Sequence, residues 1–126
     1  MVQTDPTQLN RECNSWREIL RAQRTELTDF RAKLQQAVAR PLNRSELAQI
    51  EHYNNQIDIQ LSNISHLKHE IKDHERNAAW ELGRTSGNVS DHTWARHETL
   101  LDRYESLEHT LSDLKQEFAG FMGKIS

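Results

Sequence analysis

Five side chains in this sequence carry donor atoms that could bind a transition metal: Glu12, Cys13, Glu70, His74 and His97. Carboxylate, thiolate and imidazole groups are all common metal ligands, and imidazole with thiolate suits zinc or another late first-row metal. The five residues lie in three separate segments of the chain. They can meet only if helices bring those segments side by side, which is how helical bundles build metal sites.

His74 and His97 differ from the other histidines of the chain. Each lies in a run of apolar residues with helical spacing, His74 between Ile71 and Ala78 and His97 ahead of Tyr104. The remaining histidines fall on outward faces by the same spacing, where solvated side chains are expected. These outward residues are His52, His66, His69, His92 and His109.

Two interpretations of the candidate ligands remain open. In the first, the imidazoles of His74 and His97 bind zinc or another transition metal, and Glu12, Glu70 or Cys13 complete the ligand shell. In the second, no metal binds. The two histidines then form buried hydrogen bonds to nearby side chains, and these bonds fix the register of the helices or respond to pH. Cys13 is in that case a small packing residue.

The motifs of common catalytic sites are missing from the sequence. It contains no glycine-rich phosphate loop, no nucleophile elbow and no His-Glu-x-x-His motif. It also lacks the paired Glu-x-x-His motifs that hold di-iron centres in helical bundles. A catalytic thiol needs an electropositive and partly open setting, whereas Cys13 is expected beside glutamates. We therefore expect no enzymatic activity.

The segments that carry the candidate ligands are predicted to be three helices, over residues 6–39, 44–82 and 91–124. Apolar residues recur in each at alternating spacings of four and three, which is the pattern of a coiled-coil seam. Both connections are short, so neighbouring helices must be antiparallel. The prediction is a single domain over residues 1–126, an all-α antiparallel three-helix bundle roughly 50 Å long.

Several residues punctuate the predicted helices. Asp5 can cap the first helix, Asn43 and Glu46 form a capping box for the second, and Ser90 can cap the third. Gly83 is expected to end the second helix. The start of the first helix and the 83–90 loop then share one end of the bundle, and this end collects the candidate ligands.

Matching the heights of the helices gives two further expectations. Gln23 should lie opposite Gln60 inside the seam, where a pair of amides would fix register. Trp80 should lie at the level of Trp94 and serve, with it, as packing at the end of the bundle.

The composition restricts the class of protein. Hydrophobic residues make up 35% and charged residues 28% of the chain, which suits a long bundle with narrow apolar seams. The net charge of -3 argues against nucleic acid as a partner. No apolar run approaches the ~20 residues that span a bilayer, so no membrane association is expected. The single cysteine and the absence of a signal-peptide pattern favour the cytoplasm.

Large apolar residues off the seams indicate a protein partner. Ile19, Val38, Ile59 and Trp80 could form a dimer or docking face along the bundle. The first functional hypothesis is therefore a non-enzymatic interaction or scaffold protein that self-associates or binds another helical protein. The alternative is a metal-binding bundle whose site lies at the end carrying the 83–90 loop.

Several segments resemble a bacterial family of small helical proteins of unknown function. They are IEHYNNQ (50–56), LKHEIKDHE (67–75), HETLLDRYESLE (97–108) and LKQEFAGF (114–121). The resemblance covers nearly the whole chain and implies a soluble helical protein, without implying an activity. Asn10 stands where relatives would carry a histidine, which weakens a metal site that needs a ligand from the first helix. The positions shared with the family would be Glu12, Trp16, Glu51, His52, Gln56, His69, His74, His97 and Phe118.

Overall fold

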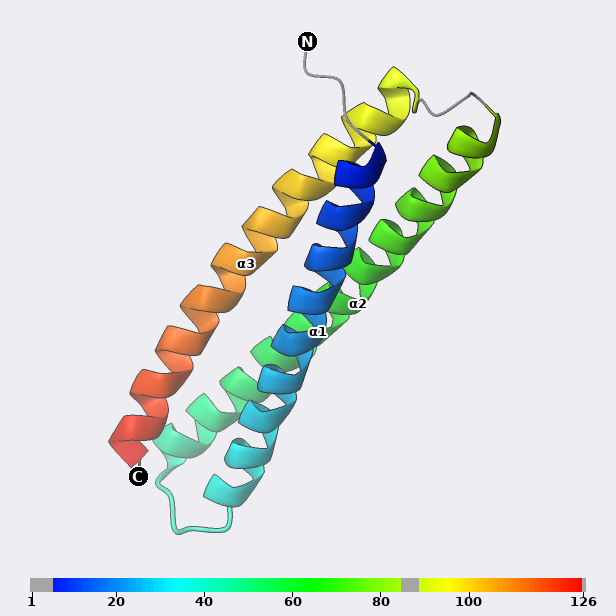
Figure 1. Cartoon of the computed structure of the whole chain (residues 1–126). Coiled ribbons are helices and arrows are strands. Elements are labelled where there is room, and N and C mark those ends of the chain that lie inside the picture. Colours follow the sequence, from blue (N-terminus) through cyan, green and yellow to red (C-terminus); the bar gives the residue numbers. More distant parts are fainter. Residues whose placement is uncertain (1–5, 85–88, 126) are drawn as a thin grey trace.

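The computed structural model describes residues 6–84 and 89–125, and these residues form three helices without a strand. Helix α1 spans Pro6–Ala37, α2 spans Arg44–Arg84 and α3 spans Asp91–Ile125. The helices alternate in direction and pack side by side in one elongated bundle (Figure 1). The predicted all-α three-helix bundle is confirmed. The helix bounds predicted from the sequence differ from these by at most two residues.

The ends of α1 and α2 differ slightly from the prediction. The chain leaves α1 through a tight turn, in which the backbone N–H groups of Ala39 and Arg40 donate to the carbonyls of Gln36 and Ala37. These hydrogen bonds between residues three apart satisfy carbonyl groups that have no partner within the helix. Helix α2 continues through Gly83 to Arg84, so Gly83 does not end it. The predicted cap Asp5 lies outside the described residues.

The start of α2 carries the capping box that the sequence predicts. The side-chain oxygen of Asn43 accepts from the N–H of Glu46 at 2.7 Å, and the Glu46 carboxylate accepts from the N–H of Asn43 at 2.9 Å. Each side chain thereby satisfies a backbone donor that has no partner within the helix.

The start of α3 is tied to the end of α2 by Glu81. Ser90 caps α3 through its hydroxyl, which accepts from the N–H of Thr93 at 3.1 Å. The Glu81 carboxylate accepts from the N–H of Ser90 at 3.0 Å and from the hydroxyl of Thr93. We name these three residues the α2–α3 clasp. It holds the end of the bundle where α1 begins.

The core is a continuous apolar seam between the helices. Its aromatic members fill the space between α1 and α3, where Phe30 stacks on Phe118 at 4.4 Å and Trp16 on Tyr104 at 5.7 Å between ring centroids. The buried hydrophobic residues are Leu9, Cys13, Trp16, Leu20, Leu27, Leu34, Ala37, Ile50, Tyr53, Ile57, Ile64, Leu67, Ile71, Ala78, Leu100, Tyr104, Leu111, Leu114, Phe118 and Phe121.

The expected pair of seam glutamines does not form. Gln23 is half-buried and bonds across to α3, donating to Glu108 at 3.1 Å and accepting from Lys115 at 2.7 Å. Gln60 is buried and accepts from Asn63 on its own helix at 3.1 Å. Charged partners at the rim attract the Gln23 amide away from the seam, because hydrogen bonds to charged groups are the stronger ones.

The residues predicted to face outward are exposed. They include His52, His66, His69, His92 and His109. The large apolar side chains predicted off the seams are exposed too, and the most exposed of them is Trp80 at 63%. No helix among the described residues is long and apolar enough to cross a membrane.

Candidate metal centre

Each helix contributes one donor side chain to a buried cluster near the end of the bundle where α1 begins. Cys13 comes from α1, His74 from α2 and His97 from α3, and their exposed fractions are 0%, 0% and 1%. All three occupy seam positions of their helices, which is why the coiled-coil pattern carries them inward. We name these three residues the Cys/His cluster.

The donor atoms of the Cys/His cluster lie close enough together to share one ion. His74 Nε2 is 3.0 Å from His97 Nδ1, and Cys13 Sγ is 3.8 Å from the same nitrogen. One ligand atom from each of the three residues lies within 4.8 Å of the others. The ligand atoms of a tetrahedral zinc site are roughly 3.3–3.8 Å apart, as follows from metal–ligand bonds of about 2.0–2.3 Å. Small side-chain movements would therefore suffice.

Glu12 binds the other nitrogen of His97. Its Oε1 lies 2.8 Å from His97 Nε2, and because an ionised carboxylate can only accept, His97 donates from Nε2. Partial burial raises the pKa of Glu12, but the hydrogen bonds from His97 and Gln8 outweigh burial and leave it below its ordinary value. The carboxylate thus fixes the tautomer of His97 and leaves Nδ1 free to accept a proton or an ion.

Two tryptophans stack on the ring of His97. Trp16 stacks on it with ring centroids 4.8 Å apart and Trp94 with centroids 5.1 Å apart, at interplanar angles of 25° and 13°. The imidazole therefore has two stacked tryptophans as well as a partner at each ring nitrogen. Such contacts restrict the ring to one orientation, which is the kind of preorganisation a binding site needs.

Burial keeps Cys13 and His74 neutral in the protein without an ion. Burial, reinforced by the charges of Glu75 and Glu12, raises the pKa of Cys13 to about 12. Burial, together with His97 and Arg96, lowers the pKa of His74 to about 4. At neutral pH His74 has a free lone pair, whereas the Cys13 thiol would have to release its proton to solvent in order to bind a metal.

His74 has one ring nitrogen without a partner. Its Nδ1 is buried and makes no hydrogen bond among the described residues. In the neutral tautomer of His97 that donates to Glu12, Nδ1 accepts from His74 Nε2, and His74 Nδ1 is then an unprotonated acceptor. An unpartnered buried acceptor costs free energy. A chain of hydrogen bonds therefore runs from His74 through His97 to Glu12, which lies outside the Cys/His cluster.

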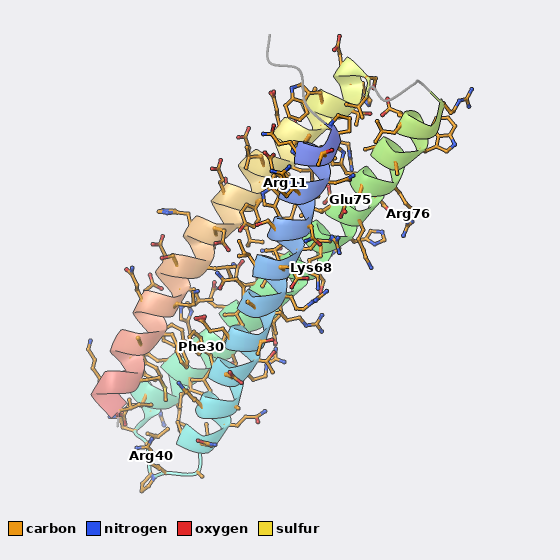
Figure 2. The ribbon with its side chains drawn as sticks, in the orientation of Figure 1. Arg11, Phe30, Arg40, Lys68, Glu75 and Arg76 are labelled. Atoms are coloured by element: carbon orange, nitrogen blue, oxygen red, sulfur yellow. The ribbon has the colours of Figure 1, made fainter. Side chains whose placement is uncertain are left out.

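The charged residues around the cluster lie at its rim. Glu75 of α2 lies beside α1 in the same part of the bundle as Arg11 (Figure 2). It forms an ion pair with Arg17 at 2.7 Å, and both side chains are 21% exposed. After burial, the charges of Glu75 and Glu12 raise the pKa of Cys13, and the charge of Arg17 opposes them.

Glu70 does not join the cluster, although it was a predicted ligand. Its carboxylate pairs with Arg103 of α3, and this hydrogen bond lowers the pKa of Glu70. Both residues line a groove of about 760 Å³ between α2 and α3. Glu70 lies one helical turn before His74, but its side chain lies at the edge of α2, where it reaches Arg103 of α3.

The tryptophans around His97 were predicted only as packing residues. Their spacing is a signal, because Trp16 follows Cys13 by three residues and Trp94 precedes His97 by three, so each lies on the same helix face as a donor. Trp80 does not join Trp94, since it is exposed and stacks under Arg84 at 4.6 Å from guanidinium to ring.

The fold and the Cys/His cluster together define an all-α three-helix bundle with a buried thiol–imidazole centre at one end. Comparison with protein-family models, with curated proteins and with solved structures finds no match to this chain. The functional argument therefore rests on the geometry of the cluster.

Proposed function

We propose that this protein binds one transition-metal ion per chain at Cys13, His74 and His97. The observation that carries the proposal is the convergence of one donor from each of three helices, within 4.8 Å, at buried positions. A buried thiol beside two imidazoles is a donor set that suits late first-row metals. We further propose a binding protein and not an enzyme, because a buried thiol with a raised pKa is a poor nucleophile.

Glu12 supports the proposal through His97. Histidine ligands commonly donate their second ring N–H to a carboxylate, which orients the ring and makes the ligating nitrogen more basic. Glu12 makes this contact at 2.8 Å. In the loaded protein His97 would bind through Nδ1 and Cys13 through its thiolate. His74 would bind through Nε2, with its proton transferred to the unpartnered Nδ1. The proton of the Cys13 thiol is released to solvent.

Elemental analysis of protein purified without a histidine tag tests the proposal. We expect about one transition-metal atom per chain, and we expect His74→Ala and His97→Ala to lose it. His109→Ala is the matched control, because His109 is exposed and lies far from the cluster in sequence. A content below about a tenth of an atom per chain, also after incubation with metal salts, would contradict the proposal.

Self-association is a second proposed function, and the exposure of two residues on α2 favours it. Ile59 and Trp80 are 50% and 63% exposed, and they are separated by three heptads, so they lie on one line of the helix. A second copy of this chain could cover that line. The test is the mass in solution: it should exceed one chain and fall in the double variant Ile59→Gln, Trp80→Gln. A mass of one chain at high concentration would contradict this second proposal.

A further inference from the structure

We infer that the ion this centre selects is monovalent copper, held by Cys13, His74 and His97 without a fourth ligand. The inference rests on the proposed metal-binding function and specifies its ligand. It follows from the number of donors, from their surroundings and from the charge that the cluster can hold.

Among the described residues, the group of donor side chains close enough to share an ion has three members, and the carboxylate of Glu75 near Cys13 is paired with Arg17. The buried seam positions one turn before and after each ligand are Leu9, Trp16, Ile71, Ala78, Thr93 and Leu100. Thr93 alone has a polar side chain, and its hydroxyl is engaged with Ser90 and Glu81 in the α2–α3 clasp. Glu12 is engaged with the far nitrogen of His97, on the side away from the ion.

Zinc is poorly served by three ligands in such a setting. Structural zinc sites have four protein ligands, and catalytic ones hold a water in the fourth position. A buried water needs two to four polar partners, which the apolar walls and the engaged Thr93 do not supply. Monovalent copper is a soft ion that prefers thiolate and is stable with three ligands. Two imidazoles and one thiolate in a trigonal arrangement are a known copper donor set.

Charge favours the same ion. A monovalent ion bound to the Cys13 thiolate is neutral as a unit, whereas divalent zinc would leave one positive charge. An uncompensated charge is costly at a site where all three ligands are at most 1% exposed. Glu12 offsets such a charge only in part, because its carboxylate is 34% exposed and contacts the far side of His97. A neutral copper–thiolate unit can occupy the buried cluster without this cost.

The inference is tested by anaerobic competition. Tag-free protein is titrated with Cu(I) in the presence of a chromogenic Cu(I) chelator, and separately with Zn(II) in the presence of a chromogenic zinc chelator. We expect about one Cu(I) per chain to resist the chelator, and zinc to transfer to its chelator. X-ray absorption of the copper form should fit one sulfur and two nitrogens in three-coordinate geometry. Cys13→Ser should lower the Cu(I) affinity by roughly 100-fold or more.

The outcomes separate this inference from the proposed function. If the protein holds Zn(II) against its chelator as firmly as Cu(I), in a site with four ligands, the copper inference is overturned and the proposed metal binding stands. Absence of both metals from the protein would overturn both. If Cys13→Ser and Cys13→Ala bind Cu(I) as tightly as the unchanged protein, Cys13 is not a ligand, and this result would also overturn the inference. Circular dichroism of the two variants checks that they fold, and His109→Ala serves again as the control.

Discussion

His97 has partners at both ring nitrogens and two tryptophans stacked on its ring. Nε2 donates to Glu12, Nδ1 faces His74 and Cys13, and Trp16 and Trp94 stack on the imidazole. A residue held in this way loses little further freedom when it binds an ion, so more of the metal–ligand energy appears as affinity. The same contacts explain how an imidazole can occupy the middle of an apolar seam, since its donor is satisfied.

Replacement of Glu12 by glutamine should weaken metal binding without removing a ligand. Glu12→Gln keeps the size of the side chain but loses the charge that makes His97 Nδ1 more basic. Loss of such a partner typically lowers metal affinity by roughly 10- to 100-fold. Competition with a chelator measures the change. Glu18→Gln, at an exposed position of the same helix, is the control. Equal affinities of the two variants would show that Glu12 does not act on the ion.

The metal-free protein should lose stability as the pH falls, because of His74. Its pKa is about 4 in the folded protein and 6.5 in the free residue. The unfolded chain therefore binds more protons between these values, and stability decreases as the pH drops through this window. The contribution is present in full above pH 6.5, and about 3 kcal/mol of it is lost below pH 4.

Denaturant unfolding of apo protein between pH 7 and pH 4 measures this loss. His74→Gln should flatten the profile, while the parts due to Glu12 and Glu81, whose pKa values are lowered, remain at the acid end. The same slope in both proteins would mean that another group titrates.

The sequence was sufficient to predict that Cys13, His74 and His97 lie close together. Each falls on a heptad line, and antiparallel helices place the three residues at the same level along the bundle. It was insufficient for Glu70. Height matching does not tell on which edge of the helix a carboxylate lies, nor that Arg103 is there to bind it. Trp94 was predicted to pack at the end of the bundle, and it is half-buried there, but the stacking of Trp94 and Trp16 on His97 depends on side-chain rotamers that spacing does not determine.

At the scale of elements, the helix ends show which signals are local. The capping box of Asn43 and Glu46 needs only residues three apart in the sequence, so the sequence alone identifies it. The α2–α3 clasp is not local in this sense, because Glu81 reaches Ser90 and Thr93 across the connection. The prediction that Gly83 ends α2 is wrong. A helix can contain a glycine, and α2 continues to Arg84.

Removal of the cap of α2 should destabilise the whole bundle. Asn43→Ala deletes the oxygen that accepts from the N–H of Glu46 at 2.7 Å. A lost N-cap typically costs about 1 kcal/mol, and the unfolding free energy from urea titration should fall by this amount. Ser45→Ala is the control, because Ser45 is exposed within the same turn. An equal loss of stability in Ser45→Ala would show that the loss does not come from the cap hydrogen bond.

At the scale of the molecule, the two ends of the bundle are held in different ways. The short connection and the capping box hold the end where α1 turns into α2. At the other end the clasp joins α2 to α3, while α1 is held by side-chain contacts such as Glu12 with His97 and Arg17 with Glu75. An ion bound by one ligand from each helix would join all three at this end.

Metal should therefore raise the melting temperature of the whole chain. An ion that binds only the folded state adds about 2.7 kcal/mol when its free concentration is 100 times the dissociation constant. For a single domain of this size, that corresponds to a rise of roughly 10 °C. Thermal melts with Cu(I), and with a chelator in its place, measure the shift. Cys13→Ser should show none of it.

Asn43→Ala provides a second control at the opposite end of the bundle. Distant sites contribute independently, so its cost should be the same with and without the ion, to within about 0.5 kcal/mol. A rise in melting temperature that persists in Cys13→Ser would place the ion elsewhere. No rise at all would mean that the ion does not bind the folded chain in preference to the unfolded one, and the cluster would then not join the three helices through an ion.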